Sequence, residues 1–154
     1  MDVEAIFRAH GDALYRYLVR QTGDEHLAQD AVQETFLRLQ ERPPDRLDGV
    51  RRWLFRTGMN VIRDTHRVDS NRLRILEAHP HRVPRPTQPP GPEASTERRE
   101  DLRRLRDALD ELREKERTAL LLRESGFKHR EIAEELGTTT ATIGTLIARS
   151  LEKL

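Results

Sequence analysis

The residues of this sequence best suited to chemistry are arginines at helical spacing in "DRLDGVRRWLFRTGMNVIRDTHR", residues 45–67. They surround a predicted helix whose other face is apolar, and with one asparagine they comprise Arg51, Arg52, Arg56, Asn60, Arg63 and Arg67. Because guanidinium groups pair with phosphate oxygens, such a face indicates binding to a nucleic-acid backbone. Trp53 and Phe55 could stack on an unpaired base. For Trp53, burial in a helical core is the favoured interpretation, whereas the position of Phe55 is left open.

A second surface of interest is acidic and lies in "DAVQETFLRL", residues 30–39. Along a helix, four side chains fall opposite a predicted apolar stripe: Asp30, Gln33, Glu34 and Leu37. The stripe comprises Leu27, Ala28, Ala31, Val32, Thr35, Phe36 and Leu39. On pattern alone, a solvated face with one exposed leucine is favoured. The functional alternative is a docking face for a basic helix of another protein, with Leu37 as its apolar anchor.

The stretch "KHREIAEELGTTTATIGTLIARS", residues 128–150, has the spacing of a helix-turn-helix. This motif needs a small residue between its helices, a glycine in the turn and a branched residue that pins the second helix. Ala133, Gly137 and Ile143 meet these requirements, and Thr139 or Thr140 can cap the second helix. The apolar side is completed by Ile132, Leu136, Leu146 and Ile147, and the predicted DNA contacts are Lys128, His129, Arg130, Thr140, Thr142, Thr145 and Arg149. An ordinary helical corner is the alternative.

Enzyme chemistry finds little support in the sequence. The chain has no cysteine and none of the spacings G-x-S-x-G, G-x-x-x-x-G-K or H-E-x-x-H. Among the histidines, only the pair His79 and His81 has even a weak metal-ligand spacing. We therefore expect no catalytic site, no bound metal and no cofactor. The N-terminal stretch lacks the features of a signal peptide and the longest apolar run is short, so we expect a cytoplasmic protein without membrane insertion.

The elements that must position these residues are all predicted to be helices. The first is expected over about residues 2–21, the second from an N-cap at Asp24 to the prolines at 43 and 44, and the third over 50–67. The first is marked by Val3, Ile6, Phe7, Leu14, Tyr17 and Leu18, and the third should bury Trp53, Leu54, Val61 and Ile62. A fourth, marked by Leu102, Leu105, Leu109 and Leu112, precedes the helix-turn-helix. The predicted fold class is all-α.

Proline and charge divide the chain into parts. All eight prolines lie between residues 43 and 92, and "HPHRVPRPTQPPGPEAST", residues 79–96, should form a semi-stiff, solvated linker. We expect a helical domain over residues 1–70, a linker over 71–97 and a second helical domain over 98–154. Residues 1–37 hold three Arg and seven Asp or Glu, whereas residues 38–74 hold ten and five. This asymmetry indicates different partners for the two segments, although the net charge is only +1.

With these motifs in order, the chain resembles a bacterial extracytoplasmic-function (ECF) sigma factor, a two-domain specificity subunit of RNA polymerase in the sigma-70 family. "DEHLAQDAVQETFLRL" is similar to the family's helix that docks on the clamp of the largest polymerase subunit. The resemblance thereby assigns polymerase binding to Asp30, Gln33, Glu34 and Leu37. "RRWLFRTGMNVIRDTHR" is similar to the segment that melts and reads promoter DNA near the transcription start, and residues 40–51 to the loop that captures a flipped base.

The resemblance also has implications for the second half of the chain. The second domain would sit on the flap of the second-largest polymerase subunit and read an upstream promoter element, and the linker would thread through the RNA exit path. An anti-sigma factor is a further implied partner. Where the family usually has glycine, threonine, valine, lysine, serine and arginine, this chain has Ala141, Thr142, Ile143, Gly144, Thr145 and Leu146. Since two basic contacts are missing, we expect weak upstream-element binding by the second domain alone, with polymerase docking supplying the effective concentration.

Two other classes of function are considered. A free-standing helix-turn-helix regulator would have to supply its own DNA affinity, and the low basicity of the recognition helix counts against it. A helical interaction protein that has lost DNA function is disfavoured by Arg52, Arg56, Asn60 and Arg63. We also expect exposed apolar residues in the second domain, some of them among Leu120 to Leu122, that could meet the flap, an anti-sigma factor or the first domain.

Overall fold

The computed structural model describes residues 1–76 and 96–153, with side chains described for residues 1–67 and 97–153. Every regular element in these two ranges is a helix, which confirms the all-α fold class. The chain divides into two compact units, Met1–Gln88 and Pro89–Leu154. Residues 77–95, with most of the predicted proline-rich linker and the pair His79 and His81, lie outside the described residues.

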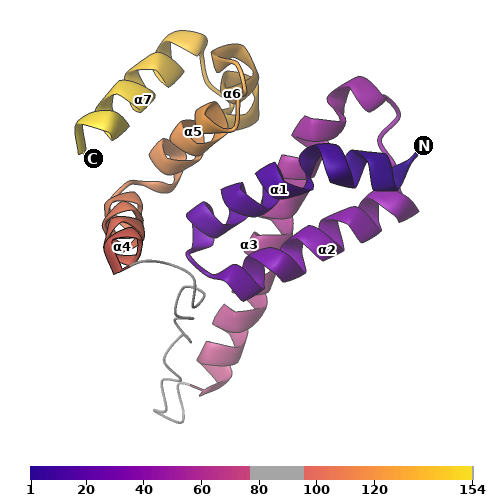
Figure 1. Ribbon diagram of the computed structural model, residues 1–154, viewed down its shortest axis with the longest axis horizontal. Coiled ribbons are helices and arrows are strands. Elements are labelled where there is room, and N and C mark those ends of the chain that lie inside the picture. Colours follow the sequence, from indigo (N-terminus) through magenta and orange to yellow (C-terminus); the bar gives the residue numbers. More distant parts are fainter. Residues whose placement is uncertain (77–95, 154) are drawn as a thin grey trace. The chain divides into compact units, whose positions relative to one another are not determined.

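The first unit is built from α1 (Val3–Thr22), α2 (Glu25–Glu41), the 3₁₀ helix η1 (Leu47–Gly49) and α3 (Val50–Leu76). Asp24 caps α2 as predicted, because its carboxylate accepts a hydrogen bond of 3.1 Å from the backbone N–H of Leu27. Asp2 caps α1 through the N–H of Ala5 in the same way. α1 and α2 lie side by side and α3 crosses behind them (Figure 1). The predicted bounds of α1 and α2 agree with the structure to within about two residues.

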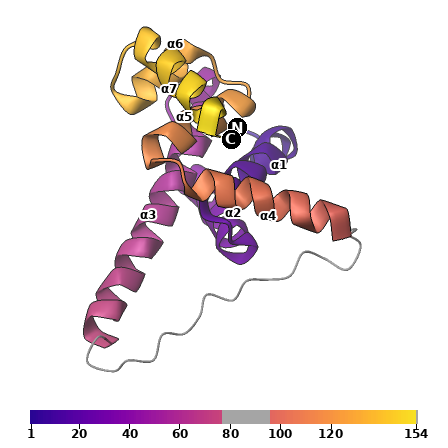
Figure 2. The same cartoon turned by 90° about the vertical axis from the view of Figure 1, so that its left-hand side faces the viewer.

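The third helix is longer than predicted. The sequence pattern placed its end near Arg67, whereas α3 continues to Leu76. Residues 59–79 contain neither glycine nor proline, so nothing interrupts the helical hydrogen bonding over this stretch. The final turns of α3 extend beyond α1 and α2 (Figure 2).

Leucines from all three helices form the core of the first unit. Leu14, Leu18, Leu39 and Leu54 are fully buried. Gly58 lets α1 and α3 approach closely, because a Cβ atom at this position would lie 3.2 Å from side-chain carbons of both Leu14 and Leu18. The core therefore depends on a small residue in the middle of α3.

The aromatic residues of the first unit depart from the predicted pattern. Phe55 is the buried aromatic of α3, 3% exposed and packed against Tyr17 with ring centroids 4.9 Å apart, whereas Trp53 is only half-buried. Residues two positions apart point to nearly opposite sides of a helix, so one face cannot bury both. Phe7 is also misplaced by the pattern, since half of its surface is exposed. Trp53 is thus buried only in part, and Phe55 is the aromatic residue that enters the core.

The second unit contains α4 (Thr96–Asp110), α5 (Glu114–Glu124), α6 (His129–Leu136) and α7 (Thr140–Lys153). Its core is formed by Leu109, Leu112, Ala119, Leu120, Leu121, Leu122, Phe127, Ile132, Ala133, Ile143 and Ile147. The expectation that some of Leu120 to Leu122 are exposed is wrong. α5 packs against both α6 and α7, so consecutive leucines on several of its faces are covered (Figure 1). The exposed leucines of this unit are instead Leu102, Leu105 and Leu151.

Candidate functional site

The acidic α2 face, defined as Asp30, Gln33, Glu34 and Leu37, lies on the surface of the first unit. Asp30 and Gln33 are exposed, Glu34 is half-buried, and Leu37 is 53% exposed at the centre of the face. The opposite stripe is buried as predicted, apart from Leu27, which is half-buried. An apolar side chain ringed by carboxylates and an amide can bind a basic, partly apolar surface.

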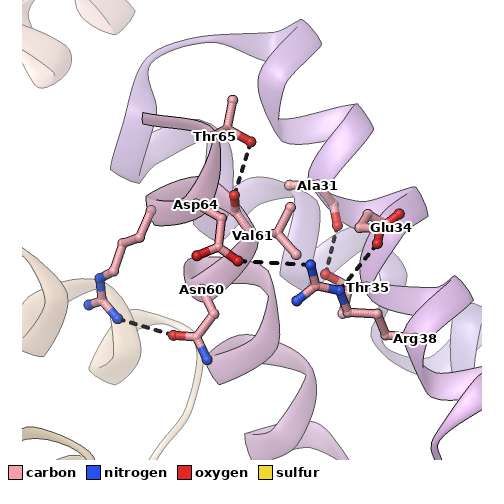
Figure 3. A network of polar contacts seen from close by, with 9 residues as sticks. Ala31, Glu34, Thr35, Arg38, Asn60, Val61, Asp64 and Thr65 are labelled. Atoms are coloured by element: carbon pink, nitrogen blue, oxygen red, sulfur yellow. Dashed lines mark hydrogen bonds and ion pairs between the residues drawn. The ribbon is translucent and has the colours of Figure 1, made fainter. Parts of the chain in front are cut away.

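An ion-pair network joins this face to α3. The Arg38 guanidinium lies 3.2 Å from the Glu34 carboxylate and 3.9 Å from that of Asp64, so it links α2 with α3 (Figure 3). These side chains are about half exposed, so the network orients the groups more than it stabilises the fold. Glu34 therefore lies beside the Arg38 guanidinium at the edge of the contact between α2 and α3.

The sequence interpretation missed one exposed aromatic ring. Phe7 of α1 packs edge-on against Phe36 of α2, with ring centroids 5.0 Å apart, and remains 51% exposed. Gly11, one turn later on α1, is the residue that could have indicated this position of Phe7, because a Cβ atom there would lie 3.4 Å from the Phe7 ring. A large aromatic residue followed four positions later by glycine can lie along its own helix instead of entering the core.

The basic surface of α3, called here the arginine stripe, comprises Arg52, Arg56, Asn60, Arg63 and Arg67. At about 100° per residue these five positions fall within about 80° of one another. All but Arg52, which is half-buried, are exposed. Nη1 of Arg63 donates a hydrogen bond of 3.4 Å to Oδ1 of Asn60, so these two side chains are adjacent. Asn60 and Asp64 both project from α3 near its contact with α2 (Figure 3).

Arg51 is the one predicted DNA contact of α3 that lies apart from the stripe. It is about 100° away from Arg52 around the helix and close to His10 of α1. Burial, together with the positive charge of Arg51, lowers the pKa of His10 below its ordinary value. Arg51 thus lies near α1, on a different side of α3 from the arginine stripe.

Trp53, not Phe55, is the aromatic side chain available beside the stripe. The ring of Phe55 is buried in the core, whereas Trp53 is partly accessible and lies about 20° from Asn60 around α3. Leu47 of η1, just before α3, is 55% exposed. An accessible indole next to guanidinium groups can stack on an unpaired base while the cations contact its backbone.

The helix-turn-helix of the second unit has the predicted geometry. Gly137 adopts a left-handed conformation with φ of 65°, and Ala133 and Ile143 are buried where α6 and α7 meet. Thr139 is the cap, since its hydroxyl oxygen accepts a hydrogen bond of 3.2 Å from the backbone N–H of Thr142. Lys128 and Arg130 are exposed at the start of α6, and His129 is half-buried.

The surface of α7 that faces away from the core has one positive charge. The α7 outer face comprises Ala141, Thr142, Thr145, Ala148 and Arg149, all of which are exposed, and only Arg149 among them is charged. The exposed Glu152 lies on the same side in the last turn of the helix. Thr140, at the first position of the helix, is exposed as well. Gly144 and Leu146, which stand where the family resemblance implies a lysine and an arginine, are half-buried.

Other kinds of site are not indicated in the part of the chain that the structure describes. Within it, no group of three or more histidine or carboxylate side chains is arranged to hold a metal ion. None of the helices of residues 1–76 and 96–153 combines the length and apolar character that crossing a membrane requires.

Two family models match the two units of the chain. Residues 6–72 match Sigma-70 region 2, and residues 102–154 match Sigma-70, region 4. The first match contains the acidic α2 face and the arginine stripe, and the second contains the helix-turn-helix. Each family model thus covers motifs that belong to one of the two compact units.

Two curated relatives match nearly the whole chain. The ECF RNA polymerase sigma factor SigE of Mycolicibacterium smegmatis is 32% identical over 157 residues, which cover 98% of this chain and 59% of that protein. The ECF RNA polymerase sigma factor SigL of Mycobacterium tuberculosis is 31% identical over 146 residues, which cover 92% of this chain and 80% of that protein. The chain thus spans about three-fifths of the length of SigE and four-fifths of that of SigL.

Two solved structures share the fold. The sigma factor RpoE of Bartonella quintana, crystallised with the anti-sigma factor NepR, superposes with a TM-score of 0.76 at 20% identity, covering 97% of this chain and 92% of that one. CnrH, solved in complex with the cytosolic domain of CnrY, gives a TM-score of 0.68 at 23% identity and covers 98% and 83%. Since both family models and the similarity to SigL agree with this fold, the chain belongs to the ECF sigma factors of the sigma-70 family.

Proposed function

We propose that this chain binds core RNA polymerase through the acidic α2 face and directs it to promoters. The observation that carries the proposal is Leu37, 53% exposed at the centre of a face that otherwise presents Asp30, Gln33 and Glu34. An exposed leucine surrounded by acidic and amide groups is the composition of an anchor in an interface with a basic helix. The clamp of the largest polymerase subunit is the proposed partner of this face.

Promoter DNA is the proposed ligand of the arginine stripe. Its four arginines and Asn60 share one side of α3, and the accessible Trp53 lies at their edge. This arrangement suits a displaced strand, because guanidinium groups contact the phosphates while an aromatic ring stacks on an unpaired base. Opening of the duplex near the transcription start is the step that we assign to this surface.

The second unit is proposed to contact the flap of the second-largest subunit and the upstream promoter element. Residues 1–70 and 98–154 would then act as separate binding modules that residues 71–97 connect. An anti-sigma factor is a further proposed partner, since the structural relatives RpoE and CnrH were each solved with a binding protein, in the first case the anti-sigma factor NepR. We propose that the protein acts in the cytoplasm, where these partners lie.

A single substitution in the acidic α2 face tests the proposal. The full-length chain carrying Leu37→Ala should bind core RNA polymerase at least about tenfold more weakly than the wild type, because a central apolar anchor contributes disproportionately to affinity. Arg20→Ala is the control, since this exposed residue of α1 lies outside the acidic α2 face and should leave affinity within about twofold. Binding would be measured by titration of labelled chain with core enzyme.

The outcome separates this function from its alternative. Equal affinities of Leu37→Ala and wild type would show that the acidic α2 face is not part of the interface with polymerase. Absence of any wild-type binding to core polymerase would favour a free-standing helix-turn-helix regulator, which needs DNA affinity of its own.

A further inference from the structure

The α7 outer face has few groups that can donate a hydrogen bond to a base. Guanine presents two acceptors in the major groove, and its usual protein partners are arginine and lysine. On this face Arg149 is the one such residue, and it lies late in the helix. The remaining exposed positions, Ala141, Thr142, Thr145 and Ala148, have a methyl group each. The surface is therefore poorly suited to guanine.

The threonine hydroxyls of α7 are partly engaged within the helix. The Thr145 hydroxyl donates its hydrogen to the carbonyl oxygen of Ala141 at 3.3 Å. The hydroxyls of Thr139 and Thr142 lie 2.9 Å apart, so one of them donates to the other. A hydroxyl whose hydrogen is used in this way retains acceptor lone pairs and its neighbouring methyl group.

Adenine–thymine pairs match these remaining groups. In the major groove adenine offers the N6 amino group as a donor, and thymine offers its C5 methyl group. An accepting threonine oxygen suits the former, and alanine or threonine methyl groups suit the latter. Both kinds of base pair present one donor and two acceptors in the major groove, so the group that distinguishes adenine–thymine pairs for this face is the thymine methyl group, which cytosine lacks.

We propose, on the basis of the proposed function, that α7 selects promoters whose upstream element is rich in adenine–thymine pairs. Ala141, Thr142, Thr145 and Ala148 recognise thymine methyl groups, and Lys128 and Arg130 at the start of α6 provide phosphate contacts. Because apolar contacts replace ionic ones, the upstream contact has a small dependence on salt. Docking on polymerase supplies the local concentration that such a contact needs.

Selection with the assembled enzyme tests this specificity. Core polymerase with the full-length chain would be offered promoters randomised over the upstream element, and bound sequences would be counted. Enrichment of adenine–thymine pairs is expected. Enrichment of guanine, or no preference at any upstream position, would overturn the proposal, the latter result indicating that the α7 outer face meets a protein.

Removing the thymine methyl group identifies the contact. Deoxyuridine in place of thymine in the selected element should weaken binding about threefold to fivefold for each buried methyl group. Thr145→Val keeps the methyl group and loses the hydroxyl, so it should keep the discrimination between thymine and uracil. Thr145→Ser keeps the hydroxyl but loses the methyl group, so it should lose the discrimination between thymine and uracil. The reverse pattern would show that a hydroxyl hydrogen bond reads the element and would overturn the role of the methyl groups.

A gain of charge provides an independent check. A Cβ atom at Gly144 would meet nothing within 4 Å, so Gly144→Lys adds a cation without a clash. This variant should bind upstream DNA more tightly. The slope of log affinity against log salt should steepen by about 1, as expected for one added phosphate contact, and deoxyuridine should weaken binding less than it does for wild type. An unchanged salt slope would place α7 away from DNA. Binding to core polymerase, measured separately, distinguishes failure of this specificity from failure of the proposed function, whose loss would overturn both.

Discussion

Gly137 and Gly144 belong to the same helix-turn-helix but are expected to respond in opposite ways to substitution. Gly137 has φ of 65°, a conformation that costs other residues about 1–2 kcal/mol, so Gly137→Ala should lower the free energy of unfolding by about that amount. Gly144 lies within α7 with open space around it, so Gly144→Ala should raise it by roughly 0.5–1 kcal/mol. Chemical denaturation of both variants measures the two effects. A decrease for Gly144→Ala would mean that the added methyl group disturbs packing.

A second prediction at this scale concerns His10. Burial and the charge of Arg51 lower its pKa from 6.5, so the folded protein binds fewer protons at this site than the unfolded chain does. His10 therefore does not reduce stability above about pH 6.5, and stability should fall as the pH drops through that value toward the lowered pKa. Urea unfolding between pH 7.5 and 5 should show a smaller decrease for His10→Gln than for wild type. Identical pH profiles would assign the dependence to other groups.

At the scale of elements, α7 is fastened to α5 by its last turn. Nζ of Lys153 lies 3.0 Å and 3.1 Å from the two carboxylate oxygens of Glu116, whose side chain is only 6% exposed. Ser150 is fully buried, and its hydroxyl hydrogen-bonds to the carbonyl oxygen of Leu146 at 2.7 Å. The end of the recognition helix is thus held on α5 by a polar contact as well as by apolar packing.

This contact predicts the effect of removing its cation. Lys153→Met should lower the free energy of unfolding by about 1–3 kcal/mol, because it leaves a buried carboxylate without its partner. Adding Glu116→Gln should recover part of the loss, since the uncompensated charge is then gone. Denaturant titration of the single and double variants measures the coupling. Additive losses would mean that the two side chains do not interact in solution.

At the scale of the whole molecule, the surfaces proposed for polymerase, for melted DNA and for the upstream element occupy different helices. The acidic α2 face and the arginine stripe of α3 belong to the first unit, and the α7 outer face belongs to the second. Acidic and basic groups are separated along the chain, so a protein with a net charge of only +1 can present surfaces of opposite sign. The low net charge therefore does not argue against DNA binding.

Salt dependence tests this division. Arg56→Ala with Arg63→Ala should reduce the slope of log affinity against log salt for promoter binding by the polymerase complex by about 1 for each arginine that contacts a phosphate. Affinity for core polymerase should remain within about twofold of wild type. Arg20→Ala, an exposed arginine of α1 outside the stripe, is the control and should change neither quantity. An unchanged slope in the double variant would show that the arginine stripe does not contact DNA phosphates.

Features that depend on neighbours within one or two helical turns could be predicted from the amino-acid sequence. Asp24 as a cap, the buried stripe of α2, the exposed Leu37 and the turn at Gly137 all follow from spacings of three or four residues and from intrinsic backbone preference. The family resemblance rested on the same local motifs. Such signals are readable because the residues that produce them are adjacent in the chain.

Which of several equivalent side chains face a partner element depends on how the helices pack. Packing buried Phe55 more fully than Trp53, left Phe7 on the surface, covered Leu120 to Leu122, and placed Arg51 near His10. It also joined Arg38 to Asp64 and Glu116 to Lys153, pairs that are 26 and 37 residues apart in the sequence. An amphipathic pattern states that a helix has a buried face, but the width of that face and the partner of each polar group depend on how the other helices pack against it.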